Sequence, residues 1–216
     1  MWWLVIPIIG FVGKSVYDAI TDDQQSPTPP KQSTLELNFE RLSRQLRIHK
    51  GHKVAILGQP GSGKSSLLKK MTDGKVFPLP VIGVQTDATD WSSDVDCNLL
   101  CFYKDYAFVD IPGYDTLTHP KYLFKSTFPF SYFDSFIFVF HGKLHGSDEE
   151  IFQLATSTGK RICIARSFLD SLENDEVNES EKDIRKRLKV DRSIPVVFFS
   201  NRSGKGINQV LNSIRF

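Results

Sequence analysis

Residues 54–65, VAILGQPGSGKS, form the stretch of sequence that decides the fold. The first four residues are apolar and predict a buried strand, the glycine-rich segment predicts a loop, and Lys64 begins a run of helix formers. This is the complete pattern G-x-x-x-x-G-K-[ST] in the strand, loop and helix setting that it requires. Such a loop turns its backbone N–H groups inward and adds the positive end of a helix, so it is suited to binding a triphosphate.

The positions of this loop have separate expected roles. Lys64 would reach the β- and γ-phosphates, and the Ser65 hydroxyl would ligate Mg²⁺. The residues expected to contact the nucleotide are Gly58, Gln59, Gly61, Ser62, Gly63, Lys64, Ser65 and Ser66. We therefore predict a nucleotide-binding site in which Lys64 is also a catalytic residue.

A second motif, DIPG at residues 110–113, directly follows a predicted apolar strand. In triphosphate sites an aspartate at a strand end holds Mg²⁺, usually through water, and a glycine three residues later lets its backbone N–H approach the γ-phosphate. We therefore expect Asp110 among the metal ligands and Gly113 in the catalytic set. A threonine of the preceding loop should complete the metal site, with Thr89 as the first choice and Thr86 as the alternative.

Apolar runs alternate with helical patterns from residue 53 to the end of the chain. Strands are expected at 53–57, 98–102, 106–110, 136–140, 161–165 and 195–199, and helices from the phosphate loop to residue 71 and at 147–159, 179–189 and 207–214. The strands 98–102 and 106–110 form an antiparallel hairpin, and Ser147 with Glu150 should cap the helix at 147–159. The other apolar runs are typical of parallel strands buried on both faces. The sequence thus predicts a three-layer, doubly wound α/β fold with a six-stranded, mostly parallel sheet and one antiparallel edge strand.

The chain before this domain divides into three segments. Residues 1–20 begin with the apolar run MWWLVIPIIGFVG, which as a helix would span only about 18 Å against a hydrocarbon core of about 30 Å. Two interpretations stay open for it: attachment to a membrane, and packing of a hydrophobic helix on the domain or on a partner. Residues 21–33 predict a linker, residues 34–49 an amphipathic helix with a solvated or lipid-facing basic side, and residues 50–216 the nucleotide-binding domain.

Composition limits the remaining functions. The formal net charge is +2, so charge gives no signal for nucleic acid as a partner. The three cysteines, Cys97, Cys101 and Cys163, cannot all pair, and two of them lie in apolar, strand-like runs. This indicates a reducing compartment, so the sequence predicts a cytoplasmic protein, with attachment to a membrane through residues 1–20 left open.

The motifs together resemble a known class of proteins. GQPGSGKS, the threonine-bearing loop, FVDIPG, RSFLD and SNR occur in the order seen in small GTPase domains of the translation-factor-related class. Over residues 50–216 the chain is most similar to the immunity-related GTPases and to the Era-like GTPases of the 50S ribosome-binding type. The resemblance implies a six-stranded P-loop GTPase sheet, GTP or GDP bound with Mg²⁺, and two switch loops that respond to the γ-phosphate.

The base-reading motif departs from the family pattern. The family has [NT]-K-x-D, whereas residues 167–170 are SFLD. Asp170 would accept from the N1–H and the exocyclic amine of guanine, a donor pair that adenine lacks. Phe168 would stack on the base in place of the lysine stem; alternatively, Phe168 is a core residue and Asp170 a helix cap. Ser200 and Asn201, in the segment SNR, match the family loop that meets the base carbonyl.

The residue after DIPG is Tyr114, where Ras-type enzymes have the glutamine that orients the attacking water. We therefore expect slow intrinsic hydrolysis, raised by an activating protein, a lipid surface or self-association. Two alternatives remain at this stage. One is a GTP-binding scaffold with negligible turnover, and the other is an ATP-using P-loop enzyme, favoured by the missing lysine at Phe168.

Overall fold

The computed structural model describes residues 32–83 and 89–214. The hydrophobic segment expected at 1–20 and most of the linker expected at 21–33 lie outside the described residues. Among the helices of the two described ranges, none has the length and apolarity needed to cross a bilayer.

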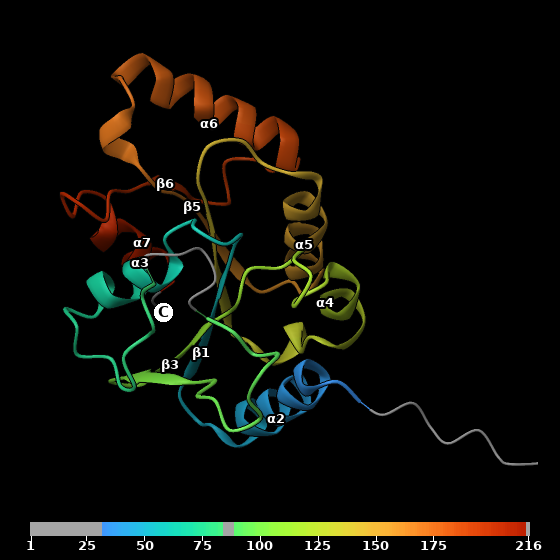
Figure 1. Cartoon of the computed structure of the whole chain (residues 1–216). Helices are drawn as coiled ribbons and strands as arrows, with labels where there is room; N and C mark the ends of the chain where they lie inside the picture. Colours follow the sequence, from blue (N-terminus) through green and yellow to red (C-terminus); the bar gives the residue numbers. More distant parts are fainter. Residues whose placement is uncertain (1–31, 84–88, 215–216) are drawn as a thin grey trace, which may run out of the picture. The chain divides into compact units, whose positions relative to one another are not determined.

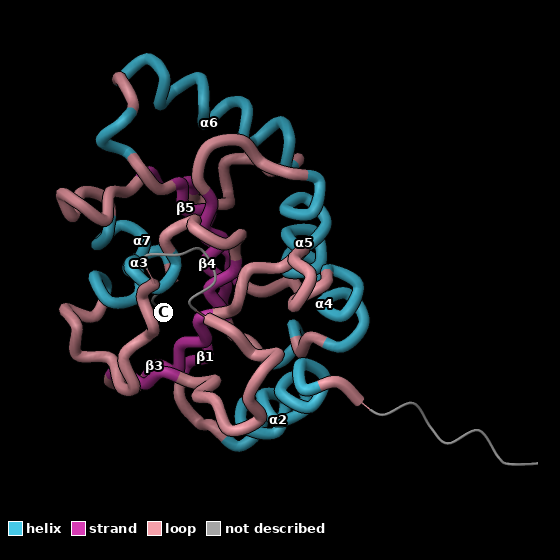
Figure 2. Tube along the Cα trace, viewed as in Figure 1, coloured by secondary structure: helices cyan, strands magenta, loops and turns pink. Residues whose placement is uncertain are grey.

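A six-stranded sheet forms the centre of the described chain (Figure 2). Its strands are β1 (His52–Leu57), β2 (Cys101–Tyr103), β3 (Tyr106–Asp110), β4 (Ser135–Phe140), β5 (Arg161–Arg166) and β6 (Val196–Phe198). The spatial order is β2-β3-β1-β4-β5-β6, and every neighbouring pair is parallel except β2 with β3. The predicted mostly parallel sheet with one antiparallel edge strand is therefore confirmed.

Helices cover both faces of this sheet. They are α2 (Thr34–Ile48), α3 (Lys64–Met71), α4 (Lys121–Thr127), α5 (Gly146–Ser157), α6 (Asn174–Leu188) and α7 (Ile207–Ser213). Helices α3 and α7 contact each other on one face, while α2 contacts α4, α4 contacts α5 and α5 contacts α6 on the other (Figure 1). This is the three-layer, doubly wound arrangement that the sequence predicts.

Strand β4 shows why the apolar runs are continuous. Phe136, Phe138 and Phe140 belong to the core beneath α2, α4, α5 and α6, whereas Ile137 and Val139 belong to the core beneath α3 and α7. Successive side chains of a strand point to opposite faces, so a strand that is covered on both sides is apolar throughout. Every residue of β4 is accordingly buried.

Helix α5 begins differently from the sequence expectation. It starts at Gly146, so Ser147 lies inside the helix and the capping box expected for Ser147 with Glu150 is wrong. Instead, the backbone N–H of His145 donates to a carboxylate oxygen of Asp148 at 2.8 Å. The prediction fails because three acidic residues, Asp148, Glu149 and Glu150, follow one another here, and Asp148 is the one that caps the backbone of His145.

Two other boundaries are also corrected. Helix α6 begins at Asn174 rather than at residue 179, and acidic residues such as Glu176 in its first turn favour a helix N-terminus. Strand β2 begins at Cys101 rather than at residue 98. Its first residue, Cys101, pairs with Phe108, and the described residues before it make no ladder pairs with β3.

Helix α2 belongs to the same compact unit as the sheet. Contacts divide the chain into Met1–Gln32 and Ser33–Phe216. The helix expected at 34–49 and the domain expected at 50–216 thus fall in one unit. The buried residues of α2 are Leu35, Asn38, Phe39, Leu42 and Leu46, which form a stripe at helical spacing.

Phe39 is the centre of the contact between α2 and the domain. Its side chain is fully buried. Its ring meets the rings of Trp91, Phe124 and Phe128 edge-on, with centroids 6.2, 5.1 and 5.4 Å away. Aromatic pairs in this arrangement contribute beyond the area that they bury.

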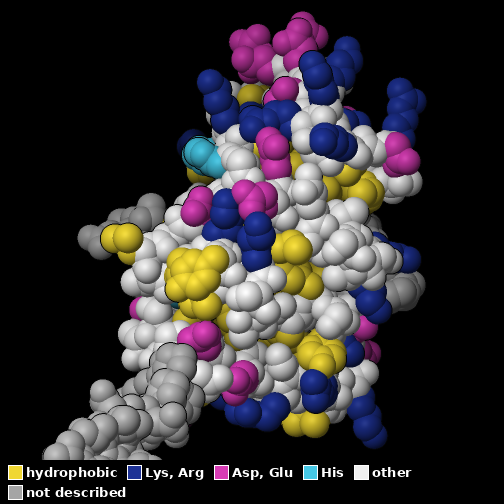
Figure 3. All heavy atoms as spheres, turned by 90° about the vertical axis from the view of Figure 1, so that its right-hand side faces the viewer, with side chains coloured by type: hydrophobic (Ala, Val, Ile, Leu, Met, Phe, Trp, Pro, Cys, Tyr) yellow, Lys and Arg dark blue, Asp and Glu magenta, His cyan; other side chains and the backbone are white. Residues whose placement is uncertain are grey.

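Helix α6 covers the sheet with only two of its side chains. Ile184 and Leu188 are buried, one turn apart, and acidic and basic residues make up most of the rest of the helix. Figure 3 shows these two kinds of charge intermixed over the upper part of the face, where α6 lies. An ion pair of 2.7 Å between Arg187 and Glu149 joins α6 to α5. The outer face of α6 is therefore a solvated, charged surface.

Replacing Phe39 by alanine should lower the free energy of unfolding by about 3–5 kcal/mol, because it removes a buried ring from a packed cluster. Leu37→Ala, at a 40% exposed position of the same helix, should cost much less. Urea unfolding followed by circular dichroism measures both changes. Equal, small losses for the two variants would show that α2 does not belong to the domain core.

Candidate nucleotide-binding site

The candidate site lies at the carboxyl edge of the sheet, where β1 separates β3 from β4. The chain passes from β1 to the β2–β3 hairpin on one side and then crosses to β4 on the other. Ligands of open α/β sheets bind at such a reversal of topology. The phosphate loop, residues 58–63, connects β1 to α3 at this point (Figure 1).

Close contact with β4 determines the path of the phosphate loop. Gly58 has a φ of +150°, and a Cβ at this position would lie 2.0 Å from the carbonyl oxygen of Val139. Only glycine allows this approach. The loop ends at Gly63, the N-cap of α3. The first backbone N–H groups of an α-helix have no acceptor within the helix, so the start of α3 is suited to an anion.

Lys64, the first residue of α3, is only 7% exposed. Its ammonium donates hydrogen bonds to the carbonyl oxygens of Gly58 at 2.8 Å and Gln59 at 2.9 Å. The positive charge is therefore held over the phosphate loop rather than directed into solvent.

Three side chains expected at the metal ion lie together. The Ser65 hydroxyl donates to Oδ2 of Asp110 at 2.6 Å, and the Thr89 hydroxyl donates to the same oxygen at 3.3 Å. Asp110 ends β3 and pairs with Ile56 of β1, which brings it beside the start of α3. The alternative threonine, Thr86, lies outside the described residues.

This cluster fits a small divalent cation. Asp110 is 6% exposed, and its Oδ1 is buried without a hydrogen-bond partner among the described residues. Burial raises the pKa of Asp110 above its usual value, while Lys64 and Ser65 oppose the rise. Asp110 and Thr89 also line a cavity of about 260 Å³. A cation would satisfy the unpaired carboxylate oxygen, and Mg²⁺ usually takes one or two protein carboxylates, with waters and phosphates as its other ligands.

The DIPG motif begins the segment 110–119, which is the expected second switch segment, and it packs directly on the phosphate loop. Gly113 is buried, and a Cβ there would lie 2.2 Å from Cδ of Pro60. Tyr114 is fully buried, and its hydroxyl donates to Asp148 of α5 at 2.7 Å. Burial raises the pKa of Tyr114 well above its usual value, and Asp148 adds to the rise. The phenol therefore stays protonated and lies in the core beneath α5.

His119 links the second switch segment to the chain that follows Thr89. Its ring is 2% exposed, and Nε2 accepts from the backbone N–H of Trp91 at 3.1 Å. Nδ1 lies 3.0 Å from the Thr118 hydroxyl. The same Nε2 lies 3.2 Å from the carboxylate of Asp90. The sequence gives no signal for these contacts, because Trp91 and His119 are far apart in the chain and share no local pattern.

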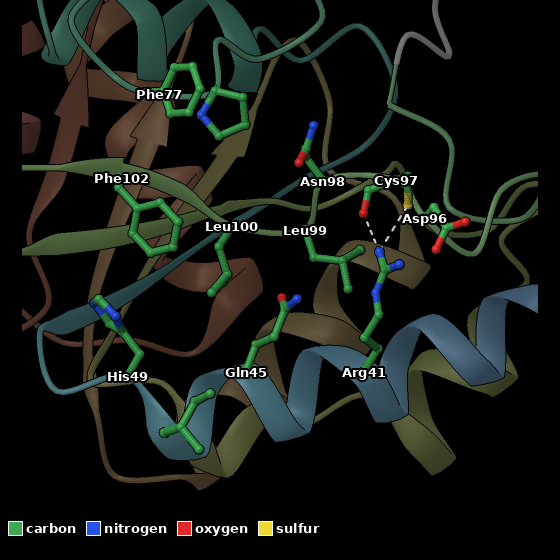
Figure 4. A pocket seen from close by; sticks show the side chains of 12 residues that line it. Arg41, Gln45, His49, Phe77, Asp96, Cys97, Asn98, Leu99, Leu100 and Phe102 are labelled. Atoms are coloured by element: carbon green, nitrogen blue, oxygen red, sulfur yellow. Dashed lines mark hydrogen bonds between the residues drawn. The ribbon is translucent and has the colours of Figure 1, made fainter.

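Helix α2 holds the chain between Thr89 and β2. Figure 4 shows Arg41 reaching from α2 to Cys97, where its guanidinium donates to the backbone carbonyl and lies 3.6 Å from the sulfur. Beside this contact is a pocket of about 560 Å³. Gln45 of α2 and His49, the residue that follows this helix, form one wall of the pocket, and the segment leading into β2 forms another. The pocket lies outside the phosphate and metal cluster.

Two loops form the side of the site where base reading is expected. The hydroxyls of Ser200 and Ser203 donate to the two carboxylate oxygens of Asp170, the second at 2.8 Å. These bonds, first that from Ser200, lower the pKa of Asp170 below its usual value. The Asn201 amide donates to the carbonyl oxygen of Gly63 at 3.2 Å. Asp170 is thus an ionised acceptor. The loop that carries its partner Ser200 is also joined to the phosphate loop, through Asn201.

Phe168 is an exposed residue beside these loops. It is 53% exposed, has a φ of +63° and places its ring 4.7 Å from that of His141. The alternative in which Phe168 is a core residue is therefore wrong. Asp170 lies within the short 3-10 turn Leu169–Ser171 and does not cap a helix.

The remaining predicted residues of the phosphate loop have different settings. The Gln59 amide donates to the hydroxyl of Ser147 at 2.9 Å. Ser62 is buried, and its hydroxyl has no hydrogen-bond partner among the described residues. Gly61 is exposed, and Ser66 is partly buried in the first turn of α3. The contact of Gln59 with α5 is not foreseen from the sequence, which predicts only a helix there.

Comparisons with known proteins agree with this geometry. GTPase Der of Agathobacter rectalis is 27% identical over an alignment of 173 residues, and the match covers 75% of this chain and 38% of Der. EngB of Clostridium botulinum, described as a probable GTP-binding protein, is 26% identical over an alignment of 188 residues, and the match covers 79% of this chain and 87% of EngB. The chain thus spans little more than a third of the length of the Der relatives.

Solved structures show the same fold. A crystal structure of a probable GTP-binding protein EngB has a TM-score of 0.55 at 16% identity, covering 75% of this chain and 96% of that one. The bacterial selenocysteine-specific elongation factor EF-Sec has a TM-score of 0.53 at 19% identity, covering 76% of this chain and 28% of that one. A family model described as 50S ribosome-binding GTPase matches residues 53–202. With the phosphate loop, the DIPG motif and the P-loop GTPase sheet all inside that match, the chain belongs to the 50S ribosome-binding GTPase family.

Proposed function

We propose that the chain is a switch that binds GTP with Mg²⁺ and hydrolyses it to GDP and phosphate. Membership of a GTPase family implies that its nucleotide is a guanine nucleotide. The observation that supports the proposal most is the meeting of three groups on one glycine-rich loop. These are the ammonium of Lys64, the hydroxyl of Ser65 and the buried carboxylate of Asp110. An ammonium beside a cation-binding carboxylate is the combination that a magnesium triphosphate needs.

The phosphate loop would bind the triphosphate through its backbone. The N–H groups at the start of α3 meet the α- and β-phosphates, and Lys64 transfers its hydrogen bonds from the loop carbonyls to the β- and γ-phosphates. The backbone N–H of Gly113 would donate to the γ-phosphate, since the motif already packs on Pro60. These donors stabilise the charge that develops as the terminal phosphoryl group leaves.

Three residues would hold the metal ion. Ser65 and Thr89 bind it through their hydroxyl oxygens, and Asp110 binds it directly or through water. When bound, Mg²⁺ would supply positive charge that offsets the negative charge of the triphosphate during hydrolysis. Thr89 would contact the ion only when a γ-phosphate is present, so the loop around it would respond to hydrolysis.

Slow intrinsic turnover follows from the position of Tyr114. Its hydroxyl is committed to Asp148 in the core, so it does not orient an attacking water. The missing group would then come from an activating protein, a lipid surface or a second copy of the chain. This feature equally favours a GTP-binding scaffold with negligible turnover, which is the second candidate function.

The base would be read by Asp170 and by Phe168. The carboxylate accepts from N1–H and the exocyclic amine of guanine, while it keeps the hydroxyl donors of Ser200 and Ser203, because each carboxylate oxygen has two lone pairs. The exposed ring of Phe168 would stack on the base, and a backbone N–H at Asn201 would meet the base carbonyl. The third candidate is an ATP-using enzyme. Adenine lacks the donor pair of N1–H and exocyclic amine that Asp170 would accept from.

Single-turnover phosphate release from GTP with Mg²⁺ tests the proposed activity. We expect slow release, which Lys64→Ala should abolish, together with about a ten- to hundredfold loss of triphosphate affinity, because a charge-assisted bond to phosphate is removed. In competition against a fluorescent guanine nucleotide, GTP and GDP should displace the probe and ATP should not. Binding without any phosphate release would support the scaffold, and displacement by ATP would support the third candidate.

The wild type should bind GTP more tightly with Mg²⁺ than with EDTA. Asp110→Asn should remove most of this difference in affinity, because an amide is a poor ligand for Mg²⁺. The nucleotide-free protein should unfold at the same or a higher temperature, because the amide places no unpaired charge in the core. Titrations with both additives and a thermal melt measure the two effects. An intact Mg²⁺ dependence in the variant would contradict the metal assignment.

Phe168→Ala should weaken GDP and GTP binding equally, by about 1–3 kcal/mol, because the base and its stacking partner are common to both nucleotides. Phe102→Ala is a matched control, since Phe102 is 41% exposed on the edge strand β2, away from the base-reading loops. Equilibrium titration of the two nucleotides measures the change. Unchanged affinity in the Phe168 variant would mean that its ring does not contact the base.

A further inference from the structure

The first turn of α5 contacts both the phosphate loop and the second switch segment. Gln59 of the phosphate loop donates to the hydroxyl of Ser147 at 2.9 Å. Tyr114, next to Gly113, donates to Oδ1 of Asp148 at 2.7 Å. Two consecutive residues of one helix therefore hold the two segments expected on either side of a γ-phosphate.

The contact between Tyr114 and Asp148 is deeply buried. Tyr114 is 0% exposed and Asp148 is 1% exposed. The second carboxylate oxygen of Asp148 accepts the backbone N–H of His145 at 2.8 Å, so both oxygens are engaged. A hydrogen bond to a buried, ionised acceptor is among the stronger ones in proteins, and loss of its donor leaves the acceptor unsatisfied. The bond is thus suited to hold Tyr114 in one place.

The position of Tyr114 also determines that of Gly113. The two residues are adjacent in the chain, and the residue before them, Pro112, is buried as well. On its other side Gly113 packs on Pro60, where a Cβ would lie 2.2 Å from the proline ring. Its backbone is therefore confined between the phosphate loop and a side chain that is anchored on α5.

From this geometry we infer that Tyr114 is a positioning residue, which through Asp148 holds the backbone N–H of Gly113 ready for the γ-phosphate. The inference rests on the proposed binding of GTP and goes beyond it: the first turn of α5 determines the preference for triphosphate over diphosphate. GDP lacks the phosphate that Gly113 would contact, so its binding does not depend on this bond. The burial that keeps the Tyr114 phenol protonated also keeps it a donor at neutral pH.

The test compares the affinities of the full chain for GDP and for a non-hydrolysable GTP analogue, both with Mg²⁺. Tyr114→Phe removes one oxygen and should weaken binding of the analogue about tenfold, or about 1.4 kcal/mol, while GDP affinity changes less than about twofold. Tyr132→Phe is the matched control, because that hydroxyl bonds Arg47 of α2 and neither residue belongs to the site. It should leave the ratio of the two affinities at the wild-type value.

Asp148→Asn separates the hydrogen bond from general stability. An asparagine can accept from the N–H of His145 through its oxygen and donate to the Tyr114 oxygen through its amide, so it retains both contacts. We expect it to keep the affinity ratio near that of the wild type, even if its melting temperature falls.

The possible results distinguish this inference from the proposed function. Equal losses for GDP and the analogue in Tyr114→Phe, or no loss for either, would overturn the positioning role and leave GTP binding intact. A tenfold loss of the analogue alone in Asp148→Asn would also overturn it, because the hydrogen bond would then not be the cause. Failure of the wild type to bind both nucleotides would overturn the proposed function and the inference together.

Discussion

The close approach of Gly58 to the carbonyl oxygen of Val139 is the constraint on which the site depends. A side chain at this position would collide with β4, so the chain must turn back at the end of β1 and enter α3 within a few residues. Lys64 and Ser65 thereby arrive beside the end of β3. The register of β1 with β3 brings Asp110 beside Ser65. The turn at Gly58 thus brings an ammonium, a hydroxyl and a carboxylate together.

The helical layers connect this edge of the sheet to the rest of the domain. Phe39 fixes α2 in the core beneath α4, and α2 in turn holds the chain at Cys97 through Arg41. His119 and Tyr114 tie the second switch segment to its surroundings on two sides. The chain that follows Thr89 and the segment that follows the DIPG motif would both respond to a γ-phosphate. Each contacts helices or loops that are packed into the core, so a movement of either segment would be transmitted to those elements.

The sequence predicts the sheet well, because its strands follow local rules. The residues expected at the phosphates and the metal ion lie together, and their roles stay predictions. The pattern G-x-x-x-x-G-K-[ST] after an apolar strand predicts a phosphate loop. A continuous apolar strand such as β4 must be covered on both faces. The departures come from contacts between distant residues. No local pattern predicts that Ser147 accepts a hydrogen bond from Gln59 instead of capping α5, or that Asp148 accepts one from Tyr114. Helix α4 was not expected, because it is short and has no side-chain cap.

Calorimetric titration of GDP into the full chain with Mg²⁺ tests the central claim most directly, because it asks whether the loop after β1 binds a nucleotide at all. We expect saturable heat with one nucleotide per chain, and far weaker heat from ATP, which Asp170 cannot pair with. No heat from GDP or from GTP would contradict the assignment of the phosphate loop and, with it, the roles of Lys64, Ser65 and Asp110.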